Sequence, residues 1–174
     1  ENQPTIVEVY TNEQTVFLKL NGTVIGKKNT DKNGVATFRV KYNPGTLEAT
    51  GVTSSGLESC KTSLKTAAPE TKVTLVPEES SIEVNDLAYV RLSLTDSEGN
   101  AKPSQDTEIR LVVENGDLIG FGNGCPFNEK GYQTNSCLTY FGEALAIVKP
   151  KSNGLIKIIA ESKLTNARTE IQVK

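Results

Sequence analysis

The chain has 174 residues, 36% of them apolar, with 14 glycines and no histidine, methionine or tryptophan. This length fits one large domain or two small ones and excludes a (β/α)₈ barrel, which needs about 250 residues. The absence of histidine excludes catalytic triads that use histidine and metal sites that use histidine ligands. With 19 basic and 21 acidic residues, the chain lacks the positive charge that binds nucleic acid.

In the first part of the chain, apolar residues alternate with polar ones, which is the period of a strand buried on one face. Val16, Leu18 and Leu20 share such a face. Asn21-Gly22 follows, the dipeptide preferred in a type I′ hairpin turn. Further strands are predicted at residues 24–26, 35–40 and 46–52.

Residues 66–70 (Thr-Ala-Ala-Pro-Glu) have weak periodicity and contain a proline, so we predict a short linker that separates residues 1–67 from residues 68–174. The strand pattern then restarts at residues 72–76, 88–94, 109–113, 144–149, 154–160 and 169–173. Strands with turns every 8–12 residues, and no window with a helical period, predict an all-β sandwich fold.

Residues 96–100 (Asp-Ser-Glu-Gly-Asn) have two interpretations. Asp96, Glu98 and Asn100 alternate in a way that offers oxygen ligands to calcium. The same residue types also form a favourable turn, and we favour the turn. We predict no metal site and no cofactor.

The three cysteines, Cys60, Cys125 and Cys137, lack the spacing of a zinc site and have no histidine to complete one. Cys125 and Cys137 lie in one loop-like stretch, residues 124–138. In an exported protein a disulfide between them would restrict this loop, worth up to about 3 kcal/mol. In a reducing compartment both would be thiols.

The glycine-rich segment Gly120-Phe121-Gly122-Asn123-Gly124 is a candidate ligand or interface loop. No Lys-Ser/Thr pair and no predicted helix follow it, which excludes a phosphate loop. Its glycines allow close approach to a neighbouring domain or a ligand, or simply a bent strand. Aromatic residues that stack on sugars or pack at interfaces lie around it: Phe127, Tyr132, Tyr140 and Phe141.

No pair of carboxylates signals glycoside hydrolysis, which needs two facing each other across a sugar. Glu78 and Glu79 are adjacent, so an extended chain points them in opposite directions. Glu108 and Glu114 stand about 20 Å apart along one predicted strand. We therefore predict no catalytic residue and no enzymatic activity for this chain by itself.

Short motifs follow one another in a fixed order along the chain. Those of the first part are Val9-Tyr10-Thr11-Asn12, Val16–Gly22, Ile25-Gly26, Phe38-Arg39-Val40 and Tyr42–Ala49. Those of the second part are Val90–Asp96 with Glu98-Gly99-Asn100, Gly120–Gly124 followed by Pro126, and Phe141–Val148 with Gly154. In this order they resemble the C-terminal immunoglobulin-like domains of glycoside hydrolase family 2 β-galactosidases.

The resemblance implies two consecutive immunoglobulin-like β-sandwich domains, residues 1–67 after an absent catalytic barrel and residues 68–174 at the C-terminus. It implies a non-catalytic accessory module of an exported bacterial enzyme, periplasmic or extracellular. Its partners would be the barrel and other domains of the parent chain, and it would support packing, access to the active site or oligomer contacts. The start at Glu1, without an initiator methionine or a leader, fits an excised or processed piece.

The family's acid/base and nucleophile glutamates belong to the barrel, and no residue here matches those motifs. One departure from the family pattern is Cys125, which replaces a polar residue before the proline and strengthens the disulfide hypothesis with Cys137.

Two alternatives stay open. A carbohydrate-binding module would need exposed aromatic residues beside Gly120–Gly124. A cell-surface adhesion or spacer array would need more sandwich repeats in the flanking sequence. No apolar run reaches the roughly 18 residues of a membrane helix, so we expect no membrane partner. The balance of 19 basic against 21 acidic residues likewise predicts no nucleic acid partner.

Overall fold

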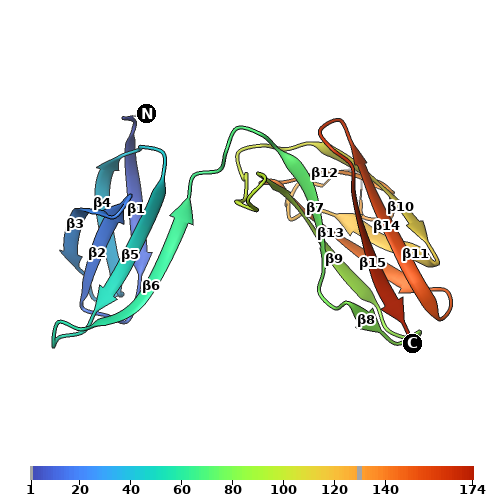
Figure 1. The fold of residues 1–174 in the computed structure, drawn as a ribbon, viewed down its shortest axis with the longest axis horizontal. Helices are drawn as coiled ribbons and strands as arrows, with labels where there is room; N and C mark the ends of the chain where they lie inside the picture. Colours follow the sequence, from blue (N-terminus) through green and yellow to red (C-terminus); the bar gives the residue numbers. More distant parts are fainter. Residues whose placement is uncertain (1, 129–130) are drawn as a thin grey trace. The chain divides into compact units, whose positions relative to one another are not determined.

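The computed structural model describes residues 2–128 and 131–174, and the chain divides into two compact units, Glu1–Thr66 and Ala67–Lys174 (Figure 1). The described residues form strands and turns without a helix, and none of their segments is a helix able to cross a membrane. The division predicted from the sequence lies one residue beyond the boundary between these units.

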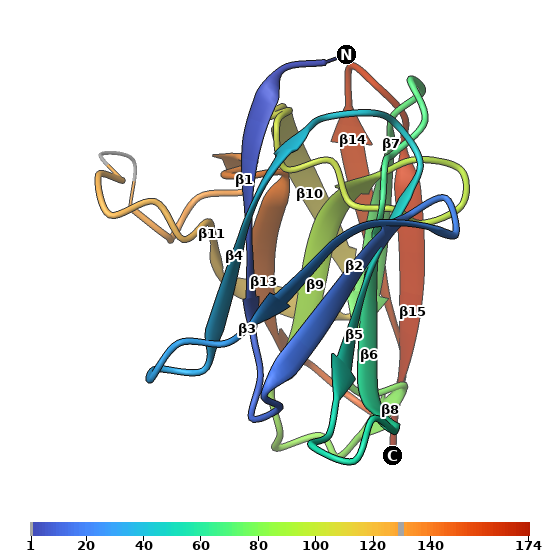
Figure 2. The ribbon, with the colours of Figure 1, turned by 90° about the vertical axis from the view of Figure 1, so that its left-hand side faces the viewer.

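The first unit is a sandwich of antiparallel strands. One sheet pairs β1 (Pro4–Tyr10) with β4 (Val35–Lys41). The other has the order β3-β2-β5-β6 and contains β2 (Thr15–Leu20), β3 (Thr23–Asn29), β5 (Thr46–Val52) and β6 (Glu58–Lys65). Figure 2 shows β2 and β3 running side by side.

The core of this unit consists of apolar side chains at alternating positions along the strands. The core side chains are Val16, Leu18, Ala36, Phe38 and Ala49, with Val7 and Val9 of β1 packed against them. The hairpin between β2 and β3 turns at Asn21 and Gly22, whose φ angles are 50° and 81°. Both central residues therefore have the positive φ of a type I′ turn, which confirms the prediction.

The second unit is a larger sandwich. One sheet has the order β12-β10-β14-β15-β8, with β8 (Ser81–Ile82), β10 (Glu108–Glu114), β12 (Ser136–Leu138), β14 (Gly154–Ser162) and β15 (Ala167–Val173). The other has the order β11-β13-β9-β7, with β7 (Lys72–Pro77), β9 (Ala88–Thr95), β11 (Gly116–Gly122) and β13 (Glu143–Pro150). Alternate side chains of both sheets fill its core, including Val90, Leu92, Leu111, Ala146 and Ile158. The predicted fold class, two consecutive immunoglobulin-like β-sandwiches, is confirmed.

Some strands were not predicted because their sequences do not alternate. β6 is exposed along its whole length, and its place depends on antiparallel pairing with β5. β11 takes Gly120, Phe121 and Gly122 into the sheet, as the bent-strand alternative allows, and the register shifts between Leu118 and Gly120. The glycine-rich segment thus leaves the sheet only at Asn123.

Candidate functional site

The outer face of the β11-β13-β9-β7 sheet carries the candidate site. Gly122 on β11 lies opposite Leu145 on β13, which lies opposite Arg91 on β9. Gly120 lies opposite Ile147 in the same way. Directly opposed residues project to one face of an antiparallel sheet. Because both β11 positions are glycine, this face has no β11 side chain opposite Leu145 or Ile147.

A hollow of about 680 Å³ lies over this face. We call it the β11–β13 hollow. Its lining includes the whole segment Gly120–Gly124 and the apolar side chains of Leu145 and Ile147. A Cβ atom at Gly120 would stand 3.7 Å from Cδ1 of Ile147, in ordinary contact, whereas a Cβ atom at Gly122 would overlap the Tyr132 ring. The glycine at position 122 therefore creates the space in which Tyr132 lies.

Tyr132 is attached to β11 through its backbone. The Phe121 N–H donates a 2.7 Å hydrogen bond to the Tyr132 carbonyl oxygen. The side chain of Tyr132 lines the hollow and remains 53% exposed. The structure thus brings Tyr132 together with the glycine-rich segment, as a ligand-binding arrangement requires.

A hairpin turn contributes two more aromatic rings to the hollow. Tyr140 and Glu143 exchange backbone hydrogen bonds of 3.0 and 3.1 Å. Phe141 and Gly142 occupy the centre of the turn with φ angles of 51° and 73°. The Tyr140 and Phe141 rings lie 4.5 Å apart between centroids, and Phe141 is 61% exposed. A side chain as large as that of Phe141 rarely adopts this left-handed conformation.

Charged side chains also line the hollow. They are Glu78, Arg91 and Glu143, each on an exposed position. In the part of the chain that the structure describes, none of these side chains has a hydrogen bond or an ion pair. Two carboxylates and one guanidinium are thus available to a ligand, and their summed charge is −1.

Phe127 and the predicted cysteine pair lie in a different place. A second hollow, of about 190 Å³, is lined by Cys125, Phe127 and Cys137. Phe127 is 86% exposed and does not line the β11–β13 hollow. The predicted ligand residues are thus divided between two hollows, and Asn123 lines both.

The cysteines are thiols in the structure, with Cys60 exposed, Cys125 half-buried and Cys137 buried. The Cys137 thiol donates to the Leu138 carbonyl oxygen at 3.1 Å. The side chain of Asn123 fixes the start of this loop, since its Oδ1 accepts from the Cys125 N–H at 2.8 Å and its Nδ2 donates to Leu138 O at 2.6 Å. The Cys125–Cys137 disulfide stays a prediction.

The Asp96 segment forms a turn. The Asp96 carboxylate, 1% exposed, accepts hydrogen bonds from the backbone N–H groups of Glu98 and Asn100 and from the Asn100 side chain. It also accepts one from the Ala68 N–H at 2.8 Å. These donors, the Asn100 amide first, hold the pKa of Asp96 well below its usual value. The predicted turn is confirmed, and no cluster of three metal-ligating side chains occurs in residues 2–128 and 131–174.

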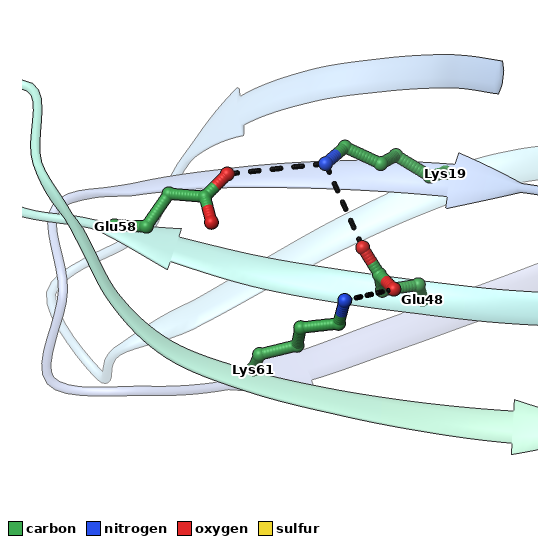
Figure 3. A network of polar contacts seen from close by, with 4 residues as sticks. All are labelled: Lys19, Glu48, Glu58 and Lys61. Atoms are coloured by element: carbon green, nitrogen blue, oxygen red, sulfur yellow. Dashed lines mark ion pairs between the residues drawn. The ribbon is translucent and has the colours of Figure 1, made fainter. Parts of the chain in front are cut away.

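In the first unit, charged side chains form a network on the exposed face of the β2-β5-β6 strands (Figure 3). Glu48 pairs with Lys61 and, at 3.6 Å, with Lys19, which also lies 3.9 Å from Glu58. The hydrogen bond that Lys61 donates to Glu48 lowers the pKa of Glu48 and raises the pKa of Lys61. Exposed ion pairs of this kind contribute little to stability and supply no reactive group.

Sequence reasoning missed several side chains of the β11–β13 hollow, among them Glu78, Arg91, Glu143, Leu145 and Ile147. The sequence did contain a sign of Leu145 and Ile147. They alternate with the buried Ala144, Ala146 and Val148, which places two aliphatic side chains on the solvent face of β13.

Known proteins resemble the chain over both units. Residues 72–170 match the family described as glycoside hydrolase family 2 C-terminal domain 5. Residues 2–60 match a domain of unknown function (DUF4982). The predicted resemblance to C-terminal domains of glycoside hydrolase family 2 is confirmed.

Individual relatives are much longer than this chain. Beta-galactosidase BoGH2A from Bacteroides ovatus is 27% identical over 158 residues, which are 88% of this chain and 18% of that protein. A glycosyl hydrolase family 2 member from Bacteroides cellulosilyticus is 30% identical with a TM-score of 0.92, over 100% of this chain and 23% of the other. A beta-glycosidase from Bacteroides vulgatus, 22% identical over 99% of this chain and 23% of its own, shares the fold with a TM-score of 0.89.

The chain thus spans about a fifth of the length of these relatives. Its longer match, residues 72–170, takes in more than half of the chain. The protein belongs to the glycoside hydrolase family 2 C-terminal domain 5 family.

Proposed function

We propose that this chain is a non-catalytic accessory module of a β-galactosidase-like glycoside hydrolase, and that it packs against the catalytic barrel of the same parent protein. The observation that carries the proposal is the alignment with Beta-galactosidase BoGH2A, in which 88% of this chain corresponds to 18% of that protein. The larger part of that relative lies outside the aligned region. A module of this size serves such an enzyme by supporting the domain that performs the chemistry.

Exposed apolar side chains of the first unit support a packing role. Ile6 and Tyr10 on β1 are 59% and 71% exposed, and both project away from the core that Val7 and Val9 contact. Apolar surface of this kind is stabilised when a neighbouring domain covers it. We propose the barrel as that neighbour.

The same proposal includes export from a bacterial cell. The family resemblance supports it, and a disulfide between Cys125 and Cys137 would accompany it, because disulfides persist in oxidising compartments. Cell fractionation of the native host tests this part, with the protein expected in the periplasm or outside the cell. Recovery in the cytosol alone would contradict it.

The packing role is tested in the full parent protein. We expect Ile6→Glu with Tyr10→Glu to lower the melting temperature of the barrel, because the two charges would be buried at the interface. The matched control is Val24→Glu on β3, a 51% exposed position of the other sheet. Equal melting temperatures for both variants and the parent would overturn packing through β1.

A further inference from the structure

We propose that the β11–β13 hollow binds a neutral pyranose residue of a carbohydrate chain. This goes beyond the accessory role, because binding here needs no catalytic barrel. The argument rests on three features of the hollow: its exposed aromatic rings, its unpaired polar groups and the two glycines that shape it.

The aromatic rings match the apolar face of a sugar. A pyranose presents C–H groups on one face, which pack on an aromatic ring as other apolar groups do. Tyr132 and the adjacent pair Tyr140 and Phe141 bring three rings into one hollow from two segments of the chain. Two of them are more than half exposed, Tyr132 at 53% and Phe141 at 61%, so they remain accessible.

Phe141 is placed there against the local preference of the backbone. Its φ of 51° belongs to the left-handed region, where a type I′ turn favours asparagine or glycine. The ring packs on Tyr140 but stays 61% exposed, so burial gives little stabilisation in return. Strained residues of this kind concentrate at functional sites. The ring at position 141 is therefore better explained by binding than by folding.

The polar groups match the hydroxyl groups of a sugar. Carboxylates of Glu78 and Glu143 can each accept hydrogen bonds from hydroxyl groups, and the Arg91 guanidinium can donate several. None of the three has a partner among the described residues that a ligand would need to displace. Hydrogen bonds to charged groups are the stronger ones, so they fix the orientation of the sugar.

The charge of the hollow selects a neutral sugar. Two carboxylates oppose one guanidinium, so a third carboxylate brought by an acidic sugar would meet net repulsion. This distinguishes hexoses such as galactose and glucose from uronic acids.

The shape of the hollow follows from β11. Side chains at positions 120 and 122 would project from the strand onto this face, and at position 122 a Cβ atom would already displace the Tyr132 ring. Glycine at 122 thus makes room for the Tyr132 ring, and glycine at 120 lets a flat ligand approach the backbone of the strand.

The test is a titration of the 174-residue chain, followed by amide chemical shifts. The probes are two neutral tetrasaccharides, β-1,4-galactotetraose and cellotetraose, and the acidic tetragalacturonate. We expect saturable shifts in residues 120–124 and 143–147 with at least one neutral probe, and weaker binding of the acidic one. Absence of saturable shifts with both neutral probes, or tighter binding of tetragalacturonate, would overturn the proposal.

Phe141→Asn separates binding from folding. Because Asn-Gly is the preferred type I′ dipeptide, we expect this variant to melt at the same or a higher temperature than the parent. We expect it to bind the neutral probe about tenfold more weakly, since stacking on one aromatic ring contributes on that scale. The matched control is Phe127→Ala, an exposed aromatic residue outside the hollow, which should bind as the parent does. An equal loss of affinity in Phe141→Asn and Phe127→Ala would contradict binding in this hollow. The proposed accessory role would not be affected by that result.

Discussion

The Lys102 ammonium nitrogen lies 2.7 Å from the carbonyl oxygen of Ala68. It also donates to the carbonyl oxygens of Pro69 at 2.7 Å and Glu70 at 2.9 Å. The Ala68 N–H in turn donates a hydrogen bond to the Asp96 carboxylate. Residues 68–70, predicted as part of a linker, are therefore anchored on the second unit.

Thr66, two residues before this segment, is the last residue of the first unit. The Thr66 N–H donates to the Gly45 carbonyl oxygen at 2.9 Å, and the Thr66 hydroxyl accepts from the Gly45 N–H at 3.1 Å. The connection between the units is thus shorter than the five residues that the sequence suggested, because hydrogen bonds to residues distant in the sequence fix both of its ends.

Removing the Lys102 ammonium group should release residues 68–70. We expect Lys102→Met to lower the free energy of unfolding of the second unit by about 1–3 kcal/mol, because three carbonyl groups lose a charged donor. Urea denaturation measures the difference. Lys163→Met, on an exposed position, is the matched control and should be within about 0.5 kcal/mol of the parent. A Lys102→Met variant as stable as this control would contradict the anchor.

Asp96 should make stability depend on pH in acid. Its pKa is depressed in the folded chain, chiefly by the Asn100 amide, so the ionised carboxylate stabilises the fold. This stabilisation is present above the unfolded pKa, near about 3.9, and is lost as the pH falls below that value toward the folded pKa. We expect the melting temperature of the parent to fall more steeply between about pH 4 and pH 2 than that of Asp96→Asn. If the melting temperatures of the two proteins fell in parallel with pH, Asp96 would not be the group that causes the acid dependence.

Leu111 and Val112 test the assignment of strand faces on β10. Leu111 is 2% exposed in the core, whereas Val112 is 38% exposed. Because a charge buried without a partner is costly, we expect Leu111→Asp to destabilise the second unit by about 3–5 kcal/mol and to yield insoluble protein. Val112→Asp should remain soluble with a nearly unchanged melting temperature. A soluble Leu111→Asp variant with the melting temperature of the parent would contradict this assignment of strand faces.

The cysteines give a chemical test of the compartment. We expect protein isolated from its native host without reductant to take up one alkylating group, at the exposed Cys60, with Cys125 and Cys137 joined. Reduction should then lower stability by up to about 3 kcal/mol, the loop-closure contribution of a disulfide. Uptake of three groups by unreduced, unfolded protein would contradict the disulfide.

Much of the fold was predictable because buried faces leave a period of two in the sequence. β9 and β13 alternate from end to end, and both were predicted within one residue of their bounds. β6 was not, because all its residues are exposed and its position comes from pairing with β5. β11 was not, because glycines at 120 and 122 remove the side chains that would have shown an alternation.

The candidate site was predictable only in part for the same reason. Composition marked the glycine-rich segment and Tyr132, which lie together. The contribution of Arg91 depends on the register of β9 against β13, a long-range pairing that no local pattern encodes. Phe127 was grouped with the segment by proximity in sequence, although the loop carries it to the second hollow.

The measurement that tests the central claim most directly is hydrolysis of a chromogenic β-galactoside by the purified 174-residue chain. We expect no turnover above buffer, because in the proposed parent enzyme a barrel outside these 174 residues performs the chemistry. Turnover that follows the purified chain through successive columns would contradict the account, since it would place a catalytic pair within these sandwiches.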